Sequence, residues 1–289
     1  MKVYNLGSLN VDYVYSVDHF VSAGETISSE KMEVFPGGKG LNQSVALARA
    51  GAAVIHGALL GDGADFLAEQ LASSGVDISK IKRVTGSPGH AIIQVDASGE
   101  NCIMIYPGTN RCLDASYVED FLSDAEEGDV LLAQNETNCL RDAFALAKKK
   151  GMKIAFNPSP YNGFIDSVPK ESVDLWFCNE TEGAALTGVS DPDGICEEFI
   201  EKYPASSLVL TLGESGSMYC DKLGVTRQSA YRAEAVDTTA AGDTFTGYYL
   251  ACIASGKSVA EALATASRAS AITVSRMGAS SSIPMIEEL

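Results

Sequence analysis

Short runs of apolar and β-branched residues alternate along the chain with longer segments whose apolar positions recur at helical spacing. Because these runs are almost continuously apolar, we expect strands that are covered on both faces. Strand–helix alternation of this kind is typical of a doubly wound, mostly parallel α/β sheet. The predicted strands are 3–7, 53–60, 129–133, 153–157, 173–178 and 207–212, and the predicted helices are 41–50, 64–74, 139–150, 194–202, 243–255 and 258–275.

A second kind of strand breaks this rhythm early in the chain. Polar and apolar residues alternate in 11–18, 30–35, 90–96 and 101–106, and the last two segments are joined by the turn-forming stretch "ASGE". Half-exposed antiparallel strands fit poorly inside a doubly wound sheet. We therefore predict one domain over residues 1–289, with a small β-sheet lid whose strands, from about 11–35 and 90–106, are inserted in it. Such a lid would expose an apolar face, so we expect a homodimer formed through the lid.

The composition narrows the classes of partner. With 289 residues, of which 46% are hydrophobic, the chain is long enough to bury a substantial core. Its 21 Lys and Arg against 38 Asp and Glu give a net charge of −17, which disfavours binding to nucleic acid or to an anionic membrane. No apolar run approaches the roughly 20 residues of a membrane span, and the first residues lack the pattern of a signal peptide. Seven scattered cysteines without a C-x-x-C pair are interpreted as buried free thiols of a protein in a reducing cytoplasm.

The stretch "AVDTTAAGDTFTG" carries the clearest candidate chemistry. Ala240, Ala241 and Gly242 precede Asp243, where an apolar helical pattern begins. Free backbone amides at a helix start form an anion site, and a carboxylate beside them can remove a proton from an attacking hydroxyl. This combination suits phosphoryl transfer. Asp243 as a helix cap is the simpler alternative, but a cap does not require three small residues before it.

Two upstream motifs offer groups that would hold a hydroxyl-rich ligand. In "FPGGKGLNQSVALARAGA", glycines precede a helix and leave room for a ligand, while Lys39 and Asn42 add a cation and an amide near the helix start. A capping loop with a solvated Lys39 explains this motif about as well. In "GSLNVD", Asn10 and Asp12 leave the first strand on one side, where they could bind vicinal hydroxyls. Taken singly, this stretch is explained better as an ordinary turn.

Loops after two later strands suggest a nucleotide site. "NETEGAALTG" follows the strand 173–178, and its Asn179 and Glu182 begin a helix, either as simple caps or to order water around Mg²⁺ beside phosphates. "TLGESG" is a second glycine loop after a strand. "ACIASGKS" has Ala251 where a P-loop needs glycine, and "GDGADF" lacks the third glycine of a dinucleotide fingerprint. A Walker ATPase and a Rossmann dehydrogenase are therefore disfavoured.

The motifs "PGGKGLNQSVA" and "DTTAAGDTFTG" resemble the N-terminal and C-terminal motifs of the ribokinase-like, or PfkB-type, sugar kinases. They occur in the family's order and at about its separation, and the resemblance spans nearly the whole chain. It implies a doubly wound α/β fold with a β-sheet lid, and an ATP-dependent kinase that phosphorylates the 5-hydroxyl of D-ribose. A kinase for fructose, deoxyribose or a nucleoside is the alternative. An inactive sugar-binding relative would be expected to lack the base or the small residues before it, and both are present.

The resemblance also implies roles for individual residues. Asp243 would be the catalytic base, and Ala240, Ala241 and Gly242 would form an anion hole. Tyr106, from the lid hairpin, departs from the family's usual small and apolar residues, and we expect it to reshape the sugar pocket. Sugar binding would use Asn10, Asp12, Gly38, Lys39, Asn42, Glu136 and Asp243. Nucleotide binding would use Asn179, Thr211, Gly213, Gly216, Gly242 and Ser267, with Glu182 in the motif for Mg²⁺ and phosphate. An activating K⁺ would be held by Asp237, Thr239, Thr273, Arg276, Gly278 and Ser282.

Overall fold

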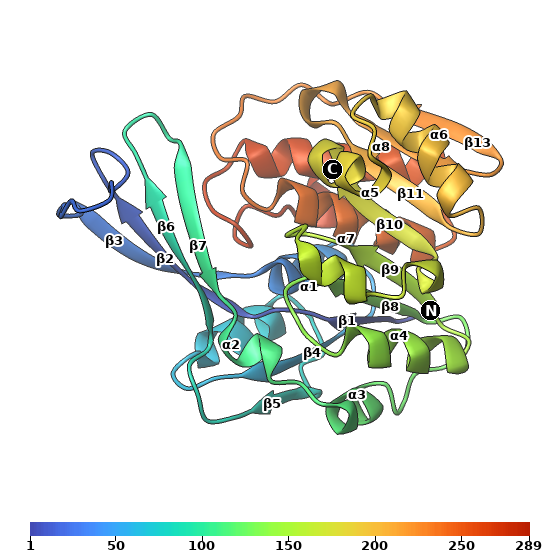
Figure 1. Cartoon of the computed structure of the whole chain (residues 1–289), viewed down its shortest axis with the longest axis horizontal. Coiled ribbons are helices and arrows are strands. Elements are labelled where there is room, and N and C mark those ends of the chain that lie inside the picture. The colour runs from blue at the N-terminus through green and yellow to red at the C-terminus, as the bar shows by residue number, and fades with distance from the viewer.

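The computed structural model describes all residues from 1 to 289. At its centre lies a nine-stranded sheet in the order β13-β12-β11-β10-β9-β8-β1-β4-β5 (Figure 1). The strands from β11 across to β5 are parallel, and β12 and β13 are antiparallel at one edge. The bounds are β1 (Val3–Leu6), β4 (Val54–Leu60), β5 (Ile81–Arg83), β8 (Val130–Gln134), β9 (Lys153–Asn157), β10 (Leu175–Asn179), β11 (Ser207–Thr211), β12 (Ser217–Asp221) and β13 (Gly224–Gln228).

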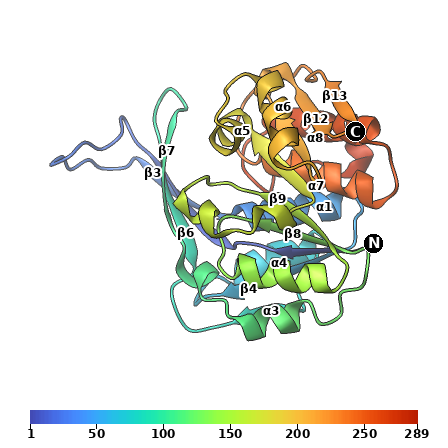
Figure 2. The ribbon, with the colours of Figure 1, turned by 45° about the vertical axis from the view of Figure 1, so that its right-hand side comes forward.

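Helices cover both faces of this sheet, and each face has its own hydrophobic core. Side chains alternate across a strand, so Trp176 enters one core and its neighbour Phe177 the other. One face carries α3 (Ala115–Phe121), α4 (Leu140–Lys149), α5 (Glu180–Thr187) and α6 (Pro192–Lys202), and the other carries α1 (Lys39–Arg49), α2 (Asp65–Ser73), α7 (Ala241–Ala254) and α8 (Val259–Val274) (Figure 2). Single 3₁₀ turns occupy Gly108–Arg111, Gly163–Ser167, Lys170–Ser172, Gly213–Ser215 and Ile286–Glu288.

A second, four-stranded sheet in the order β3-β2-β6-β7 projects from one side of the body and forms the lid (Figures 1 and 2). Its strands are β2 (Asn10–Ser16), β3 (Lys31–Gly37), β6 (Gly89–Val95) and β7 (Asn101–Tyr106). The predicted fold class, a doubly wound mostly parallel α/β sheet with a small β-sheet lid, is therefore confirmed.

Two sequence expectations about the strands were wrong in detail, and one hairpin was missed. Asn10 and Asp12 do not leave the first strand, because β1 ends at Leu6 and both residues belong to β2 of the lid. The lid is not wholly antiparallel, since β2 pairs in parallel with β6. The β12–β13 hairpin was not predicted. Its short strands mix polar and apolar residues at the edge of the sheet, so they lack the continuous apolar signal of the central strands.

The cysteines are all free, although not all are buried as the sequence suggested. Cys102 and Cys112 are exposed and Cys139 is partly buried, whereas Cys178, Cys196, Cys220 and Cys252 are buried. None of the helices is both long enough and apolar enough to pass through a membrane.

The crossing of α1 and α7 is close because Gly247 lies at the contact. A Cβ added to Gly247 would meet the backbone nitrogen of Leu47 at 2.8 Å and would also overlap Ala46. Glycine therefore lets the two helix backbones approach, which fixes the distance between the glycine-rich motif at the start of α1 and Asp243 on α7.

We expect Gly247→Ala to destabilise the protein by about 1–3 kcal/mol, because the added methyl group overpacks the α1–α7 contact. Urea unfolding would measure the change. The matched control is Gly163→Ala, where an added Cβ meets nothing within 4 Å and the change should stay within about 0.5 kcal/mol. Equal stability of the two variants would contradict this account of the crossing.

Candidate active site

Asp243 lies in the first turn of α7 and is buried against the start of α1. Its two carboxylate oxygens accept hydrogen bonds from adjacent residues of α1. The Asn42 amide nitrogen donates to Oδ2 at 3.1 Å, and the Gln43 amide nitrogen donates to Oδ1 at 2.9 Å. The structure thus joins the two glycine-rich motifs, about 200 residues apart in the chain, at one carboxylate.

The backbone before Asp243 presents open amides at the start of α7. The helix begins at Ala241 rather than at Asp243, and Ala240 has a left-handed φ of 61°, which a residue with a Cβ seldom adopts. The amides of Ala240, Gly242 and Asp243 have no acceptor in the protein, whereas Ala241 donates to the Thr238 carbonyl at 3.3 Å. Free amides therefore exist as expected, but Ala241 is not among them and Asp243 is.

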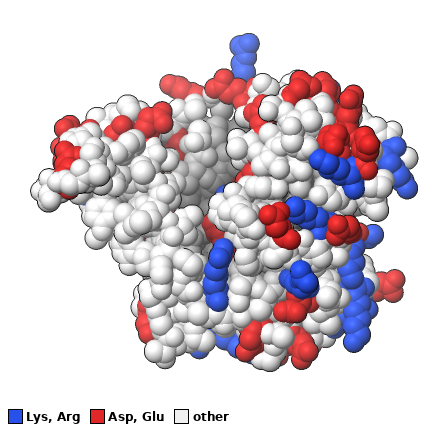
Figure 3. Space-filling model, viewed as in Figure 1, with Lys and Arg blue, Asp and Glu red and all other residues white.

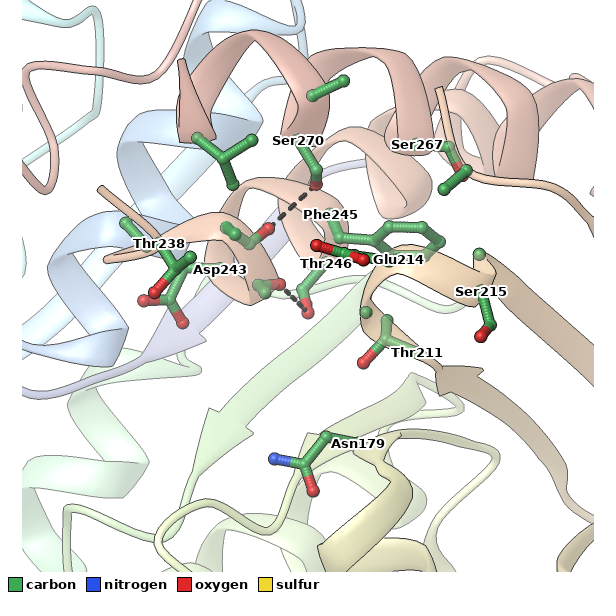
Figure 4. Close-up of a pocket in the computed structure, with 18 of the residues that line it drawn as sticks. Asn179, Thr211, Glu214, Ser215, Thr238, Asp243, Phe245, Thr246, Ser267 and Ser270 are labelled. Atoms are coloured by element: carbon green, nitrogen blue, oxygen red, sulfur yellow. Dashed lines mark hydrogen bonds between the residues drawn. The ribbon is translucent and has the colours of Figure 1, made fainter. Parts of the chain in front are cut away.

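Side chains from α7 and α8 hold this turn in place (Figure 4). Ser270 donates to the Ala241 carbonyl at 2.9 Å, and Thr246 donates to the Gly242 carbonyl at 3.0 Å. A Cβ added to Gly242 would meet nothing within 4 Å, so no protein packing requires glycine there. The space beside Gly242 is open.

The glycines at the start of α1 have a different reason from the one inferred from sequence. A Cβ on Gly37 would overlap the Asp12 carboxylate, and a Cβ on Gly40 would overlap the backbone around Ser8. Gly38 caps the helix with a φ of 97°, a conformation that favours glycine. These glycines therefore let α1 pack directly against the β1–β2 connection, in addition to any approach of a ligand.

Lys39 and Glu136 meet beneath this loop. The Lys39 backbone amide donates to Glu136 Oε2 at 3.1 Å, and the Ser8 hydroxyl donates to the same oxygen. Burial raises the pKa of Glu136, while Lys39 opposes the rise. Burial also acts to lower the pKa of Lys39, but the carboxylates of Asp243, Glu136 and Glu182 outweigh it and raise that pKa. Lys39 is thus a half-buried cation among carboxylates rather than a solvated one.

Asn10 is fixed by Asn110, a residue to which the sequence had assigned no role. The Asn110 amide nitrogen donates to Asn10 Oδ1 at 2.7 Å, and its own carbonyl accepts from the Leu9 amide at 3.0 Å. A Cβ on Gly89 would overlap this pair. Asn110 follows the lid hairpin directly, so its position links the lid to the polar pocket.

Apolar side chains surround Asp12 on its face of the lid. By register, Ala91 lies beside Asp12, Ile105 lies beside Ala91, and Ile93 follows on the same face, whereas Glu33 and Lys31 lie on that face towards the tip of the lid. Tyr106 was expected to shape the sugar pocket, but it does not lie on the face that carries Asp12. It packs against His90 on the opposite face, with ring centroids 5.1 Å apart.

A cavity of about 1080 Å³ opens on the other side of Asp243, between the strand ends and α8. Figure 3 shows the hollow between the lid and the body of the molecule. Side chains from the carboxyl ends of β10 and β11 and from α8 line the cavity (Figure 4). The predicted nucleotide residues that line it are Asn179, Glu182, Thr211, Gly213, Gly216, Gly242 and Ser267.

The polar side chains that line the cavity differ in whether they already have hydrogen-bond partners in the protein. Asn179 and Glu182 form a reciprocal capping box at the start of α5, with bonds of 2.8 and 3.0 Å. The Ser267 hydroxyl, in contrast, is buried without a hydrogen-bond partner. A buried hydroxyl of this kind is costly unless something binds to it.

Two of the residues expected at a monovalent cation, Thr239 and Gly278, contact Asp237. Its carboxylate accepts from the Thr239 amide at 2.9 Å and from the Gly278 amide at 2.9 Å. The Thr273 hydroxyl pairs with Thr244 at 3.0 Å, and Ser282 donates to the Ala279 carbonyl at 2.7 Å. The Arg276 side chain forms a salt bridge with Glu288 instead, with 2.6 Å between Arg276 Nη2 and Glu288 Oε1. No group of three or more His, Cys, Asp or Glu side chains gathers into a metal cluster.

Comparison with known proteins identifies the family. The model of pfkB family carbohydrate kinases matches residues 2–286. This chain belongs to the pfkB family of carbohydrate kinases. A pfkB relative, the ribokinase of Haemophilus influenzae, is 35% identical over 294 residues, which cover 98% of this chain and 95% of the relative.

Solved structures of pfkB kinases have the same fold. The crystal structure of ribokinase from Thermotoga maritima has a TM-score of 0.88 and 33% identity, and covers 100% of this chain and 97% of that one. The structure of Arabidopsis thaliana ribokinase complexed with ribose and ATP has a TM-score of 0.86 and 26% identity, with 99% and 96% covered.

A row of buried polar side chains behind Asp243 was missed at the sequence level. Asn5, His56, Gln134 and Asn157 each stand in an otherwise apolar strand, and Gln43 follows Asn42 in the first motif. The signal that marks them is one polar residue in each of several runs that are expected to be buried.

Asp12 provides a test of the charge balance at this site. Burial, followed by the negative charges of Glu136 and Asp243, raises its pKa from 3.8 to about 7. The folded protein therefore binds a proton that the unfolded chain releases, and stability is lost as pH rises from about 4 to 7. We expect Asp12→Asn to gain stability relative to the unsubstituted protein across that window. Thermal unfolding at several pH values would measure the difference, and a constant difference from pH 4 to 7 would contradict the assignment.

Proposed function

We propose that this protein is an ATP-dependent kinase that transfers the γ-phosphoryl group of ATP to the 5-hydroxyl of D-ribose. The observation that carries the proposal is the position of Asp243, between a pocket of polar side chains under the lid and a large cavity at the strand ends, with free amides beside it. The ribokinase relatives, one of them complexed with ribose and ATP, support this substrate pair.

The sugar side of the site is built from α1, β2 and the loop after β8. Asn42 Oδ1 is buried without a partner and is available to a sugar hydroxyl. One oxygen of Glu136 holds Ser8 and Lys39, which leaves its other oxygen for the sugar. Asn10, Asp12, Gly38 and Lys39 complete the polar surface, and the apolar lid face covers the ring.

The transfer step follows from the groups around Asp243. Its carboxylate accepts the proton of the 5-hydroxyl as that oxygen forms a bond to the γ-phosphorus. The bond between the γ-phosphorus and the β–γ bridging oxygen breaks, and ADP leaves with the electron pair. The amides of Ala240, Gly242 and Asp243 stabilise the phosphoryl oxygens, together with the positive end of the α7 dipole. The Ala241 amide can do the same only if its hydrogen bond to the Thr238 carbonyl breaks.

The cavity residues suit a nucleotide and one divalent ion. Mg²⁺ is usually bound by one or two carboxylates together with substrate phosphates rather than by a closed protein site. Glu182 fits this pattern, because only one of its oxygens is used in the capping box. Bound Mg²⁺ would neutralise charge on the phosphates. Thr211, Gly213 and Gly216 line the cavity beside Asn179, and the unpaired Ser267 hydroxyl offers a bond to the nucleotide.

We also propose that K⁺ binds near Asp237 and activates the enzyme. Asp237 ties the segment that leads into α7 to the loop after α8 through Thr239 and Gly278. Thr273, Arg276 and Ser282 lie at and after the end of α8, near Gly278 in the chain, and their carbonyl and hydroxyl oxygens are hard ligands that suit an alkali cation. Ordering this loop pair would order the amides at the start of α7.

The lid supports a homodimer. Every residue of the edge strand β7 is exposed, including Ile103, Met104 and Tyr106, and Met32 on β3 is also exposed. An apolar edge strand of this kind is a surface that natural proteins normally cover. We propose that a second copy of the chain covers it.

The seven free cysteines support a reducing, cytoplasmic setting.

A kinase assay on purified protein with ATP, Mg²⁺ and a panel of sugars tests the reaction. We expect D-ribose to be the best substrate and Asp243→Asn to lower kcat by about 10²–10⁴-fold, because the base is lost while the side-chain shape is kept. Circular dichroism would confirm that the variant is folded. Deoxyribose, fructose and a nucleoside are the comparison substrates.

Three outcomes of this assay count against the proposal. Faster turnover of another sugar would reject ribose, and full activity of Asp243→Asn would reject the base. Unchanged activity when K⁺ is replaced by tetramethylammonium would reject the activating cation.

The dimer is tested by sedimentation. We expect the unsubstituted protein to be a dimer at micromolar concentration and the double variant Ile103→Lys, Met104→Lys to be a monomer, because it places charges on both faces of β7. Leu223→Lys is the control, since Leu223 is exposed far from the lid, in the turn between β12 and β13. A monomeric unsubstituted protein would overturn the proposal.

A further inference from the structure

A row of buried polar side chains crosses the sheet beneath α1 and α7. The neighbouring strands β9, β8, β1 and β4 contribute Asn157, Gln134, Asn5 and His56 in turn, and each of these residues is buried. By register, Asn157 lies beside Gln134, and Asn5 lies beside His56. Their strand neighbours pack into apolar cores, so this row interrupts the core under the two helices that carry the site.

Hydrogen bonds connect this row to Asp243 through Gln43. The Asn5 amide nitrogen donates to Ser44 at 2.8 Å and to the Gly40 carbonyl at 2.9 Å, and Asn5 Oδ1 accepts from Gln134 at 3.0 Å. The Gln134 amide nitrogen also donates to Gln43 Oε1 at 2.7 Å. The Gln43 amide nitrogen then donates to Asp243 at 2.9 Å.

The direction of these bonds decides which end of the Gln43 amide faces Asp243. Gln43 Oε1 is occupied by the donor from Gln134, so its nitrogen must point to the carboxylate. The same nitrogen donates to Asn157 Oδ1 at 3.2 Å, and Asn157 in turn donates to the Phe177 carbonyl at 2.8 Å. A flipped Gln43 amide would place an oxygen against the carboxylate and leave Gln134 without its acceptor.

A buried polar row of this kind does not make the fold more stable than an apolar core would, so it needs another explanation. Polar side chains in a core are unfavourable unless they are paired, and apolar residues of similar size would pack there without that requirement. What the row supplies is orientation. A buried carboxylate without donors favours its protonated form, which cannot accept a proton, whereas a donor to its oxygen favours the ionised form.

We propose that Gln43 is a positioning residue of the transfer reaction, whose amide nitrogen, oriented by Gln134, fixes the Asp243 carboxylate and keeps it ionised. This inference rests on the role of Asp243 as the base proposed above. It separates two neighbours on α1, since Asn42 is left to serve both the carboxylate and the sugar while Gln43 joins the carboxylate to the buried row.

Other charged side chains also act on Asp243, and they remain the same in the variants that test the role of Gln43. Lys39 on α1 is the cation, and Asp12 on β2 and Glu136 after β8 are the like charges. Each side chain of the row itself is uncharged at neutral pH, because burial lowers the pKa of His56 to about 3. Replacing Gln43 therefore removes a donor without adding or removing a charge.

The decisive variant is Gln43→Met, which has a similar length and no donor. We expect kcat to fall about tenfold or more, with the KM for ATP little changed, and the acid limb of the pH–rate profile to move up by about one pH unit, as expected for loss of a hydrogen bond to a charged group. Gln134→Met should act in the same direction but less strongly. The double variant should be no worse than Gln43→Met, because both act through one bond to Asp243.

Tyr117→Phe is the matched structural control. It removes buried hydrogen bonds to the Ala58 and Lys80 carbonyls on the far face of the sheet. It should cost stability but leave the pH profile in place. If Tyr117→Phe moves the acid limb as much as Gln43→Met, or if Gln43→Met does not move it, the positioning role is overturned. Should Gln43→Met not fold, the shift in Gln134→Met decides the question by the same criteria.

A readout without turnover distinguishes this inference from the proposed function. Carbon NMR of labelled aspartates follows protonation of Asp243 directly, with the signal assigned by its loss in Asp243→Asn. A midpoint about one pH unit higher in Gln43→Met supports the positioning role even if ribose is the wrong substrate. An unchanged midpoint overturns the positioning role even if the enzyme phosphorylates ribose.

Discussion

The carboxylate of Asp243 is the point on which the rest of the site depends, because two helices from opposite ends of the chain meet at it. Asn42 and Gln43 of α1 bind its two oxygens, while its own backbone begins the helix whose open amides lie beside it. The close crossing at Gly247 sets the approach of the helices. A single buried contact therefore brings together the Asp243 carboxylate, the open amides at the start of α7 and the start of the polar pocket.

The glycine-rich motifs show how one residue type serves different physical needs. Gly242 has open space where a side chain would go, and in the proposed mechanism that space admits the phosphoryl group. Gly37 and Gly40 have protein there instead, namely Asp12 and Ser8. The sequence does not distinguish these two kinds of glycine, because the residue type does not show whether protein atoms or open space lie beside the backbone.

The layered fold was predictable because the buried strands and amphipathic helices leave a strong periodic signal. The lid was predictable for the same reason, since its alternation differs from that of the central strands. Asn110 and the row from Asn157 to His56 were not predicted, because their roles arise from neighbours brought together by the strand order and register. The sequence also could not show that Thr238 occupies the Ala241 amide, since that bond depends on how the backbone turns at Ala240.

The crowding of Asp12, Glu136 and Asp243 around Lys39 has a consequence for the end of the catalytic cycle. A neutral sugar enters this acidic pocket without electrostatic cost. The phosphorylated sugar carries about two additional negative charges at neutral pH, and it faces the same carboxylates once the nucleotide and its metal have gone. In the proposed reaction these carboxylates would therefore bind the product less well than the neutral sugar, in opposition to the attraction from Lys39 and the open amides of α7.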